Sequence, residues 1–379
     1  MKTRYFSTVL VILALIGPLL AGDWQRATEP RAWSFPRDHG AHPEFKTEWW
    51  YFTGNLRSQD GEAFGYQLTF FRQGLRPGPP SPSRWSLRDL YFGHFTVTDV
   101  ARGTFHHREK IDRGALGISR YSEERMDLLL DGWTIQQIGP DTFHLRANSD
   151  GLALDLRVEA VKPMVFHGDR GLSQKGPQPG NASHYYAYTR LQSTGTLTVD
   201  GRSVEVSGWS WFDHEFSTSV LGPDQIGWDW FSLQLETGEE LMVYQIRKAD
   251  GTADPLSKGS WIRADGSRVH LPSSAFFIEP TGHWTSRVSG ATYPSGWIIR
   301  VPEFQAELMV QPQVADQELK LSGLAPFYYW EGSCRISGKA FGKSVKGFGY
   351  AELTGYAAPL GQELRDEASE PSATSATQP

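Results

Sequence analysis

Residues 47–72 read TEWWYFTGNLRSQDGEAFGYQLTFFR and join a carboxylate and an aromatic cluster to an alternating strand pattern. Apolar side chains occupy every second position from Phe64 to Phe70, with Gly65, Gln67 and Thr69 between them. This period is typical of a half-buried antiparallel strand. The same alternation returns in residues 152–159, LALDLRVE. The stretch therefore predicts a β-sheet protein.

The turns between strand-like runs support the same prediction. Asp-Gly pairs begin at positions 60, 131, 150, 200, 250 and 265, and several lie between two such runs, as in residues 197–204. Asp-Gly supplies the positive φ angles of a tight hairpin turn. Beyond residue 22 no helical pattern exceeds two turns. We therefore expect an all-β protein built from meanders, with enough strands for two barrels or sandwiches.

The two ends of the chain differ from the rest in composition. Lys2 and Arg4 precede an apolar run over residues 5–20 and the small pair Ala21-Gly22. This order predicts a secretory signal peptide over residues 1–22, and hence a periplasmic or secreted protein, with an uncleaved anchor as the alternative. Residues 361–379 carry little that could form a core, so we expect a disordered tail there.

Composition limits the partners and the domain count. The formal net charge of −6 makes nucleic acid an improbable partner. Cys334 is the single cysteine, so stability must come from burial and backbone pairing rather than from internal disulfides. A chain of 379 residues is long enough for about two domains. We place them at residues 23–217 and 218–360.

Acids and tryptophans meet again at residues 227–235, where strand alternation sorts the side chains. Asp229 shares a face with Phe231 and Leu233, while Trp228 and Trp230 point the other way. A carboxylate among apolar side chains has a raised pKa, so Asp229 is a candidate general acid. The alternative is a structural aspartate that accepts hydrogen bonds from loop amides or an indole.

Residues 209–216, WSWFDHEF, offer two acids and a histidine. Alternation places Asp213 and Glu215 with Trp211 on one face and His214 on the other. His214, between two phenylalanines, is the better candidate for a buried group that transfers protons near neutral pH. The alternative is an exposed polar turn that closes the first domain.

The strand that begins near Glu48 is aromatic on both faces. Glu48 shares its face with Trp50, while Trp49 and Tyr51 point the other way. Such a segment is either core, with its polar groups hydrogen-bonded inward, or a ligand wall. His39 and His42 lie just before it but lack the ordered carboxylate or cysteine company of a metal site, so we predict no metal.

Seven ordered stretches resemble the AttH and carotenoid 1,2-hydratase family. They are residues 35–42 (FPRDHGAH), 47–54 (TEWWYFTG), 171–176 (GLSQKG), 211–215 (WFDHE), 227–230 (GWDW), 316–319 (DQEL) and 329–332 (YWEG). The resemblance implies two packed lipocalin-like β-barrel domains and, in the hydratase branch, cofactor-free addition of water to an alkene. In that chemistry Asp229 would be the acid and His214 with Asp213 the water-side pair, and aromatic faces would stabilise the cation. Trp211, Trp228 and Trp230 would form these aromatic walls.

Three functions remain open at this point. The first is an extracytoplasmic protein that binds an apolar lipid or isoprenoid, with an ABC-type export permease as partner. The second is a cofactor-independent hydratase or isomerase, a carbon-oxygen lyase of the carotenoid 1,2-hydratase type. The third is a secreted hydrolase, although the sequence has no Gly-x-Ser-x-Gly elbow. We expect the ligand at the junction of the two domains, against Glu48, Trp49, Trp50, Tyr51, Trp211, Glu215, Trp228 and Trp230.

Overall fold

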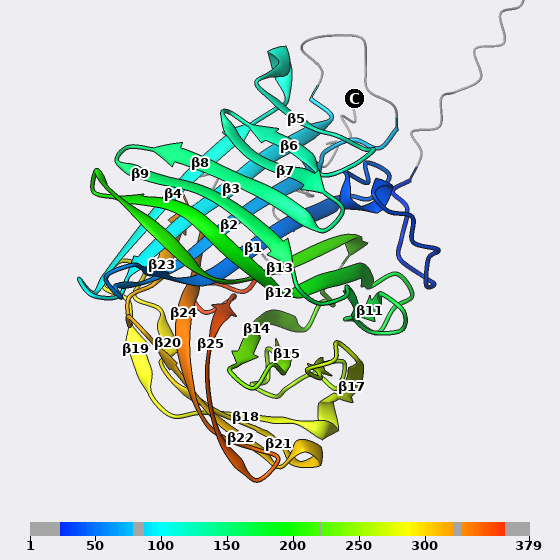
Figure 1. Ribbon diagram of the computed structural model, residues 1–379. Coiled ribbons are helices and arrows are strands. Elements are labelled where there is room, and N and C mark those ends of the chain that lie inside the picture. The colour runs from blue at the N-terminus through cyan, green and yellow to red at the C-terminus, as the bar shows by residue number, and fades with distance from the viewer. Residues whose placement is uncertain (1–22, 79–86, 220, 322–326, 361–379) are drawn as a thin grey trace, which may run out of the picture.

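The computed structural model describes residues 23–78, 87–219, 221–321 and 327–360, and it is an all-β protein (Figure 1). The expected signal peptide and C-terminal tail lie outside these residues. Four short 3₁₀ helices accompany the strands of the described ranges: η1 (Arg37–His39), η2 (Ala115–Gly117), η3 (Ser273–Ala275) and η4 (Pro302–Phe304). None of the helices that the structure describes is long and apolar enough to span a membrane.

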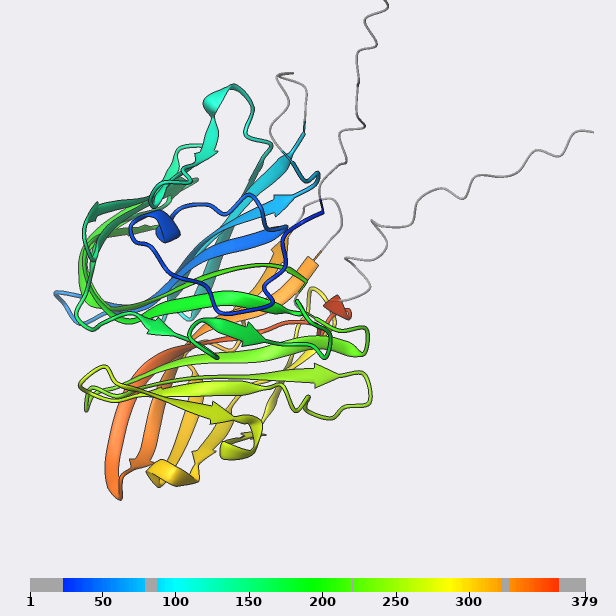
Figure 2. The same cartoon turned by 90° about the vertical axis from the view of Figure 1, so that its right-hand side faces the viewer.

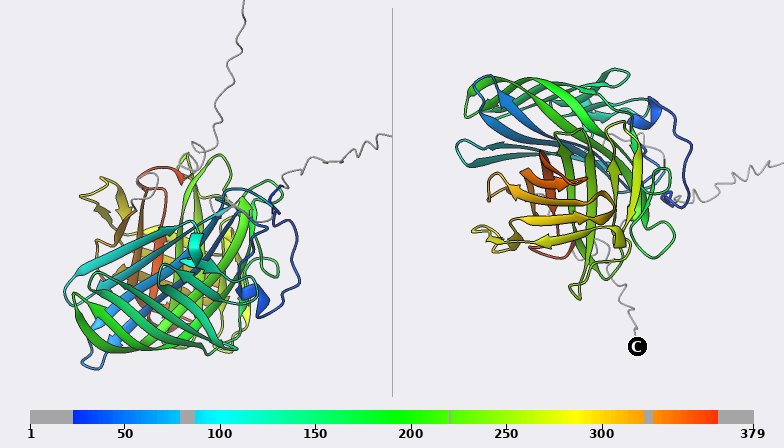
Figure 3. Two further views of the ribbon diagram at one scale, coloured as in Figure 1. Left: turned by 90° about the horizontal axis from the view of Figure 1, so that it is seen from above. Right: turned by 60° about the horizontal axis from the view of Figure 1, so that its bottom comes forward.

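The first sheet is antiparallel and curves into a nearly closed barrel, drawn in blue to green in Figure 1. Its strands are β1 (Thr47–Ser58), β2 (Ala63–Gly74), β3 (Asp89–Asp99), β4 (Thr104–Asp112), β5 (Ser119–Tyr121), β6 (Asp127–Leu130), β7 (Trp133–Gly139), β8 (Thr142–Ser149), β9 (Leu152–Ala160), β10 (Val165–Phe166), β11 (Leu172–Gln174), β12 (Ala182–Val199) and β13 (Arg202–Ser219). The order across the sheet is β4-β3-β2-β1-β13-β12-β9-β8-β7-β6-β5, and β10 and β11 pair with β12. The strands run obliquely around the barrel, as Figure 3 shows from above.

The second sheet forms the other barrel, in yellow-green to red. Its strands are β14 (Gln225–Leu235), β15 (Glu240–Lys248), β16 (Lys258–Ile262), β17 (Arg268–Pro272), β18 (Phe277–Pro280), β21 (Trp297–Val301), β22 (Ala306–Pro312), β23 (Glu318–Leu321), β24 (Phe327–Ala340) and β25 (Lys343–Leu353). Its order is β17-β16-β15-β14-β25-β24-β22-β21-β18, and β23 pairs with β24. A separate hairpin joins β19 (His283–Thr285) to β20 (Thr292–Pro294). The expected fold of two lipocalin-like antiparallel barrels is confirmed.

Each barrel fills its interior with its own side chains. Trp50 and Phe52 of β1 join the core of the first barrel, and Phe231 and Leu233 of β14 join that of the second. The first sheet ends at Ser219 and the second begins at Gln225, close to the predicted boundary. The cavity described below lies outside both of these cores.

The two barrels pack back to back (Figure 2). Strand β1 contacts β25, β2 contacts β24 and β12 contacts β14. At Gly65 on β2 a Cβ atom would lie 2.5 Å from the Cβ of Ser333 on β24, so the two sheets approach too closely for any side chain there. Next to it, the Ser333 hydroxyl donates to Oδ1 of Asn55 at 2.5 Å.

Candidate active site between the barrels

A cavity of about 120 Å³ lies where the outward faces of the two barrels meet. The first barrel supplies strands β1, β2, β12 and β13 and the loop after β11, and the second supplies β14, β15, β24 and β25. Aromatic side chains dominate the lining, with three acids and one lysine among them: Trp49, Tyr51, Gln67, Phe71, Lys175, Tyr185, Asp213, Glu215, Leu221, Trp228, Trp230, Tyr244, Ile246, Tyr329 and Glu352.

Strand alternation and register explain why these side chains meet. On β1 and β13, Trp49 lies opposite Glu215 and Tyr51 lies opposite Asp213, so all four point outward from the first barrel. The residues between them point into the first barrel. On β14 the same rule turns Trp230 towards the cavity and its neighbours along the strand into the second barrel.

Asp213 is a carboxyl group of the cavity whose burial is only partly compensated. Only 3% of the residue is exposed, and its Oδ1 has no hydrogen-bond partner. Burial raises the pKa of Asp213 to about 8, although Trp211, Tyr185 and Lys175 act to lower it. At neutral pH the group therefore carries a proton that it can donate.

Two further carboxyl groups approach from the second barrel. Burial raises the pKa of Glu352 to about 7, while the indole of Trp228, which donates to its Oε2 at 3.1 Å, acts in the opposite direction. Glu331 lies opposite Glu352 on the neighbouring strand and accepts a short hydrogen bond from the hydroxyl of Tyr51. Burial and the nearby Glu352 hold the pKa of Glu331 well above its usual range.

Lys175 is the basic group of the cavity, and it is already engaged. Its ammonium pairs with Glu215 and lies 5.5–5.7 Å from the ring centroids of Trp49, Tyr185 and Tyr244. Burial and the nearby Lys258 lower the pKa of Lys175 to about 7. The lysine therefore neutralises Glu215, and none of the other described lining residues is a lysine or arginine that could neutralise Asp213 or Glu352.

The aromatic walls are held by contacts with one another. The rings of Tyr51 and Trp230 meet edge to face, with centroids 5.3 Å apart and an interplanar angle of 85°. The indole of Trp230 donates to the hydroxyl of Tyr185 at 3.3 Å, across the junction of the barrels. Trp211 packs behind Trp230, with ring centroids 6.3 Å apart. Contacts of this kind fix the shape of the site before a ligand enters.

The structure divides the predicted site residues into two groups. Asp213, Glu215, Trp49, Tyr51, Trp228 and Trp230 line the cavity, and Trp211 supports it from behind. Asp229 does not line it, because its side chain points into the second barrel. There Asp229 accepts hydrogen bonds from Arg247 Nε at 3.0 Å and from the hydroxyl of Tyr356 at 3.0 Å. Burial raises the pKa of Asp229, and Arg247 and Tyr356 oppose that rise.

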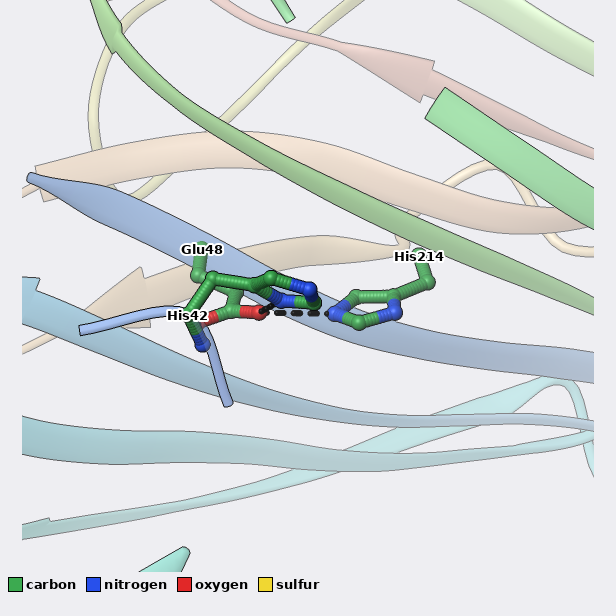
Figure 4. Close-up of side chains that lie close together, drawn as sticks. All are labelled: His42, Glu48 and His214. Atoms are coloured by element: carbon green, nitrogen blue, oxygen red, sulfur yellow. Dashed lines mark hydrogen bonds and ion pairs between the residues drawn. The ribbon is translucent and has the colours of Figure 1, made fainter. Parts of the chain in front are cut away.

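Glu48, Trp50 and His214 lie on the inner side of β1 and β13, away from the cavity. Oε1 of Glu48 accepts hydrogen bonds from His42 Nδ1 at 2.7 Å and His214 Nε2 at 2.9 Å (Figure 4). Arg72 Nε donates to the other carboxylate oxygen at 3.3 Å. Burial alone would raise the pKa of Glu48, but His42, His214 and Arg72 hold it well below its usual range.

The same trio is the group among the described residues whose atoms are close enough to hold a metal ion. The ligand atoms of His42, Glu48 and His214 lie within 4.8 Å of one another and are fully buried. Each already makes a hydrogen bond within the trio, and the guanidinium of Arg72 lies beside the carboxylate. A cation there would have to displace protons next to a fixed positive charge. The absence of a metal stays a prediction.

Several residues that line the cavity or contact its lining were missed from sequence alone. Lys175 and Glu331 lie inside quoted family stretches, but nothing local distinguishes either from a surface or core residue. Glu352 stands in an ordinary alternating strand near the end of the chain, and Tyr185 and Tyr244 carried no signal of their own. Their proximity depends on which strand faces meet across the barrels, which is a property of the tertiary fold.

Together, fold and cavity define a class: a lipocalin-like double barrel with an acidic, aromatic site between its halves. A sequence model of the AttH-like family matches residues 26–356. The chain therefore belongs to the AttH-like family.

Known proteins of three kinds are similar to this chain. A Nitrosomonas europaea protein assigned to AttH shares 31% identity and superposes with a TM-score of 0.79, over 88% of this chain and 99% of its own. Kievitone hydratase from Nectria haematococca shares the fold, with 16% identity and a TM-score of 0.67 over 89% of this chain and 97% of its own. The dehydratase asqC of Emericella nidulans is 20% identical over 219 residues, a match that spans 56% of this chain and 61% of that protein.

Proposed function

We propose that the protein is a hydro-lyase, which adds water to an alkene of an apolar substrate or removes it from the corresponding alcohol. The observation that carries this proposal is the presence of Asp213 and Glu352 in one aromatic cavity, with pKa values of about 8 and about 7. Groups with such values can exchange protons near neutral pH. The fold shared with a hydratase, and the partial match to a dehydratase, support the same reaction class.

Asp213 is the proton donor in the proposed hydration. Its protonated carboxyl transfers the proton to the less substituted alkene carbon, which breaks the π bond and leaves a tertiary cation on the other carbon. Water bonds to that cation, and the carboxylate of Glu352 accepts the proton that the water loses. The product gains one C–H and one C–O bond. Dehydration follows the same steps in reverse.

The aromatic walls stabilise the cation between these two proton transfers. A positive charge within about 6 Å of an aromatic ring face is attracted by the ring quadrupole, by about 2 kcal/mol or more where water is excluded. The contacts of Lys175 with three rings are an example of this attraction inside the same cavity.

The second candidate is binding of an apolar lipid or isoprenoid without turnover, in an extracytoplasmic protein that serves an ABC-type exporter. The aromatic lining favours such a ligand. The cavity of about 120 Å³ counts against it, since sites that enclose a ligand of drug size measure roughly 300–1,000 Å³. A cavity of this size accommodates the reacting end of a molecule better than a whole lipid.

Labelled water separates the candidates. The protein is incubated with a cell-envelope lipid extract in heavy-oxygen water, and free and bound lipids are analysed by mass spectrometry. A lipid that gains one labelled water supports the hydro-lyase, label in a released acid or alcohol supports a hydrolase, and an enriched unlabelled lipid supports the carrier.

Variants then test the assignment of the acid and the base. Asp213→Asn and Glu352→Gln should each lower turnover by about 10²–10⁴-fold, the usual contribution of a general acid or base. Glu318→Gln is the matched control. Its carboxyl is also buried, but it lies in the second barrel and accepts hydrogen bonds from Ser286, Ser289 and Tyr293. Full turnover in Asp213→Asn would contradict the proposal.

A further inference from the structure

Charge is unevenly balanced across the cavity. Among the described lining residues one cation, Lys175, faces three acids: it pairs with Glu215 and also lowers the pKa values of Asp213 and Glu352, which make no ion pair of their own. Oδ1 of Asp213 and Oε2 of Glu331 are buried and have no hydrogen-bond partner. Ionised, these acids would give the cavity a negative potential in surroundings of low dielectric constant.

Aromatic rings adjoin the unbalanced acids. Trp228 donates to Glu352, and Tyr51 lies opposite Asp213 across the β1–β13 pair. Trp230 meets Tyr51 edge to face. Rings combined with carboxylates are the usual recognition elements for quaternary ammonium groups, because the ring faces attract the charge without competing hydration.

The protein already uses this chemistry for one of its own cations. The Lys175 ammonium lies 5.7, 5.5 and 5.7 Å from the ring centroids of Trp49, Tyr185 and Tyr244, with Glu215 as its counter-ion. A second cation would find rings and acids of the same kind around Tyr51, Trp228 and Trp230.

We propose that this cavity binds organic cations, namely tertiary or quaternary alkylammonium groups, with Asp213 and Glu352 as counter-ions and Tyr51, Trp228 and Trp230 as the ring contacts. The inference rests on the site of the proposed hydro-lyase but not on its reaction. A metal ion is a poorer occupant, since the one group of described residues tight enough to ligate a metal is the His42, Glu48 and His214 trio inside the first barrel.

Affinity for the cation should rise with pH. Asp213 and Glu352 gain their charges as pH passes about 8 and about 7, and Lys175 loses its competing charge near pH 7. The other titratable groups that face this cluster are Glu215, Lys258, Glu331, Tyr51, Tyr185, Tyr244 and Tyr329. The tyrosines for which burial raises the pKa stay neutral over this range, among them Tyr51, Tyr185 and Tyr329.

A matched pair of small probes tests the proposal. Choline and 3,3-dimethylbutan-1-ol have the same shape and differ in the charge of the central atom, so the ratio of their affinities reports charge recognition alone. Titration calorimetry on the full-length protein compares the two probes at pH 6 and pH 8.5. At pH 8.5 choline should bind at least about tenfold more tightly than 3,3-dimethylbutan-1-ol, and at pH 6 this preference should be smaller.

Four variants locate the site. Asp213→Asn and Trp230→Leu should each reduce the preference for choline by about threefold to tenfold or more. Trp209→Leu, which removes a partly exposed tryptophan outside the cavity, should leave it unchanged. Lys175→Met removes the resident cation and should strengthen choline binding.

Equal affinity for the two probes would overturn the inference, as would the absence of choline binding to both the wild-type protein and Lys175→Met. Turnover of lipids without a preference for choline would reject the cation site alone. A preference for choline without incorporation of labelled water would reject the hydro-lyase alone.

Discussion

Glu48 and Asp213 are two buried carboxyl groups on neighbouring strands, and their pKa values are shifted from the ordinary value in opposite directions. Glu48 points into the first barrel and its pKa lies well below the usual range, whereas Asp213 points to the junction and its pKa is raised to about 8. Burial acts on both in the same direction. The difference comes from their partners, since Glu48 contacts two histidines and an arginine, whereas Asp213 makes no such ion pair and Lys175 offsets only part of its burial.

This contrast separates a structural acid from a chemical one. Glu48 on β1 pairs with Arg72 on β2 and with His214 on β13. Its charge therefore contributes to the stability of the folded sheet. Asp213 keeps its proton because Trp211, Tyr185 and Lys175 offset only part of the cost of ionising it. The unpaired group is available to a substrate, and the paired one is not.

Removing the structural charge should have the largest effect. Glu48→Gln leaves Arg72 buried without its full counter-charge, so the free energy of unfolding should fall by about 3–5 kcal/mol. Chemical denaturation measures this loss. Glu62→Gln, at a partly exposed ion pair with Arg202, should leave the midpoint nearly unchanged. Equal midpoints for Glu48→Gln and the wild type would show that the network adds nothing.

Low pH should destabilise the protein through groups that point into the first barrel. The folded pKa of Glu48 is depressed, so its stabilisation is present above pH 4.5 and is lost as pH falls further. Burial holds the pKa of His214 at about 4, so the unfolded chain binds the extra proton as pH falls from about 6.5. Asp213, which acts in the opposite direction, is present in both proteins, so the stability gap between the wild type and Glu48→Gln should narrow as pH falls below 4.5. A gap that stays constant from pH 7 to pH 3 would contradict this prediction.

A rise in pH should destabilise the protein through Asp213, which faces the cavity. The folded pKa of Asp213 lies above its unfolded value of 3.8, so the folded state holds the extra proton and stability falls as pH rises towards about 8. Asp213→Asn removes this loss. The variant should match the wild type near pH 4 and exceed it by about 1 kcal/mol or more at pH 8. A variant less stable than the wild type at pH 8 would mean that Asp213 is ionised and paired.

The smallest expected effect is on turnover in Asp229→Asn. Asp229 contacts Arg247 and Tyr356 inside the second barrel and not the cavity, so labelled-water incorporation should stay within about threefold of wild type while stability falls. Loss of turnover equal to that of Asp213→Asn would restore Asp229 as the general acid.

Alternation along single strands was predictable from sequence. It placed Trp49 and Tyr51 on one face of their strand and Glu48 on the other, and it placed Asp213 and His214 on different faces of theirs, as the structure has them. Which of the two faces would meet a ligand was not predictable. Asp229 and His214 looked like the better acid and base because burial among apolar side chains favours a shifted pKa.

Both residues are indeed buried, but inside filled barrels. The cavity arises only where the outer faces of β1, β13, β14 and β25 meet, and contacts there such as those of Tyr51 with Trp230 and Glu331 join residues more than a hundred positions apart. Glu352 and Lys175 belong to the site for that reason alone. A single sequence carries periodicity along each strand but not the docking of one barrel on the other.

Because one wall of the cavity comes from each barrel, the two walls can change independently in evolution. Asp213 and Tyr51 belong to the first barrel, while Trp228, Trp230 and Glu352 belong to the second. Substitutions on β14 could reshape the space offered to a substrate and leave the strands that hold Asp213 untouched. The proton donor of the proposed reaction would thus be kept by one half while β14 of the other half diversified the range of substrates.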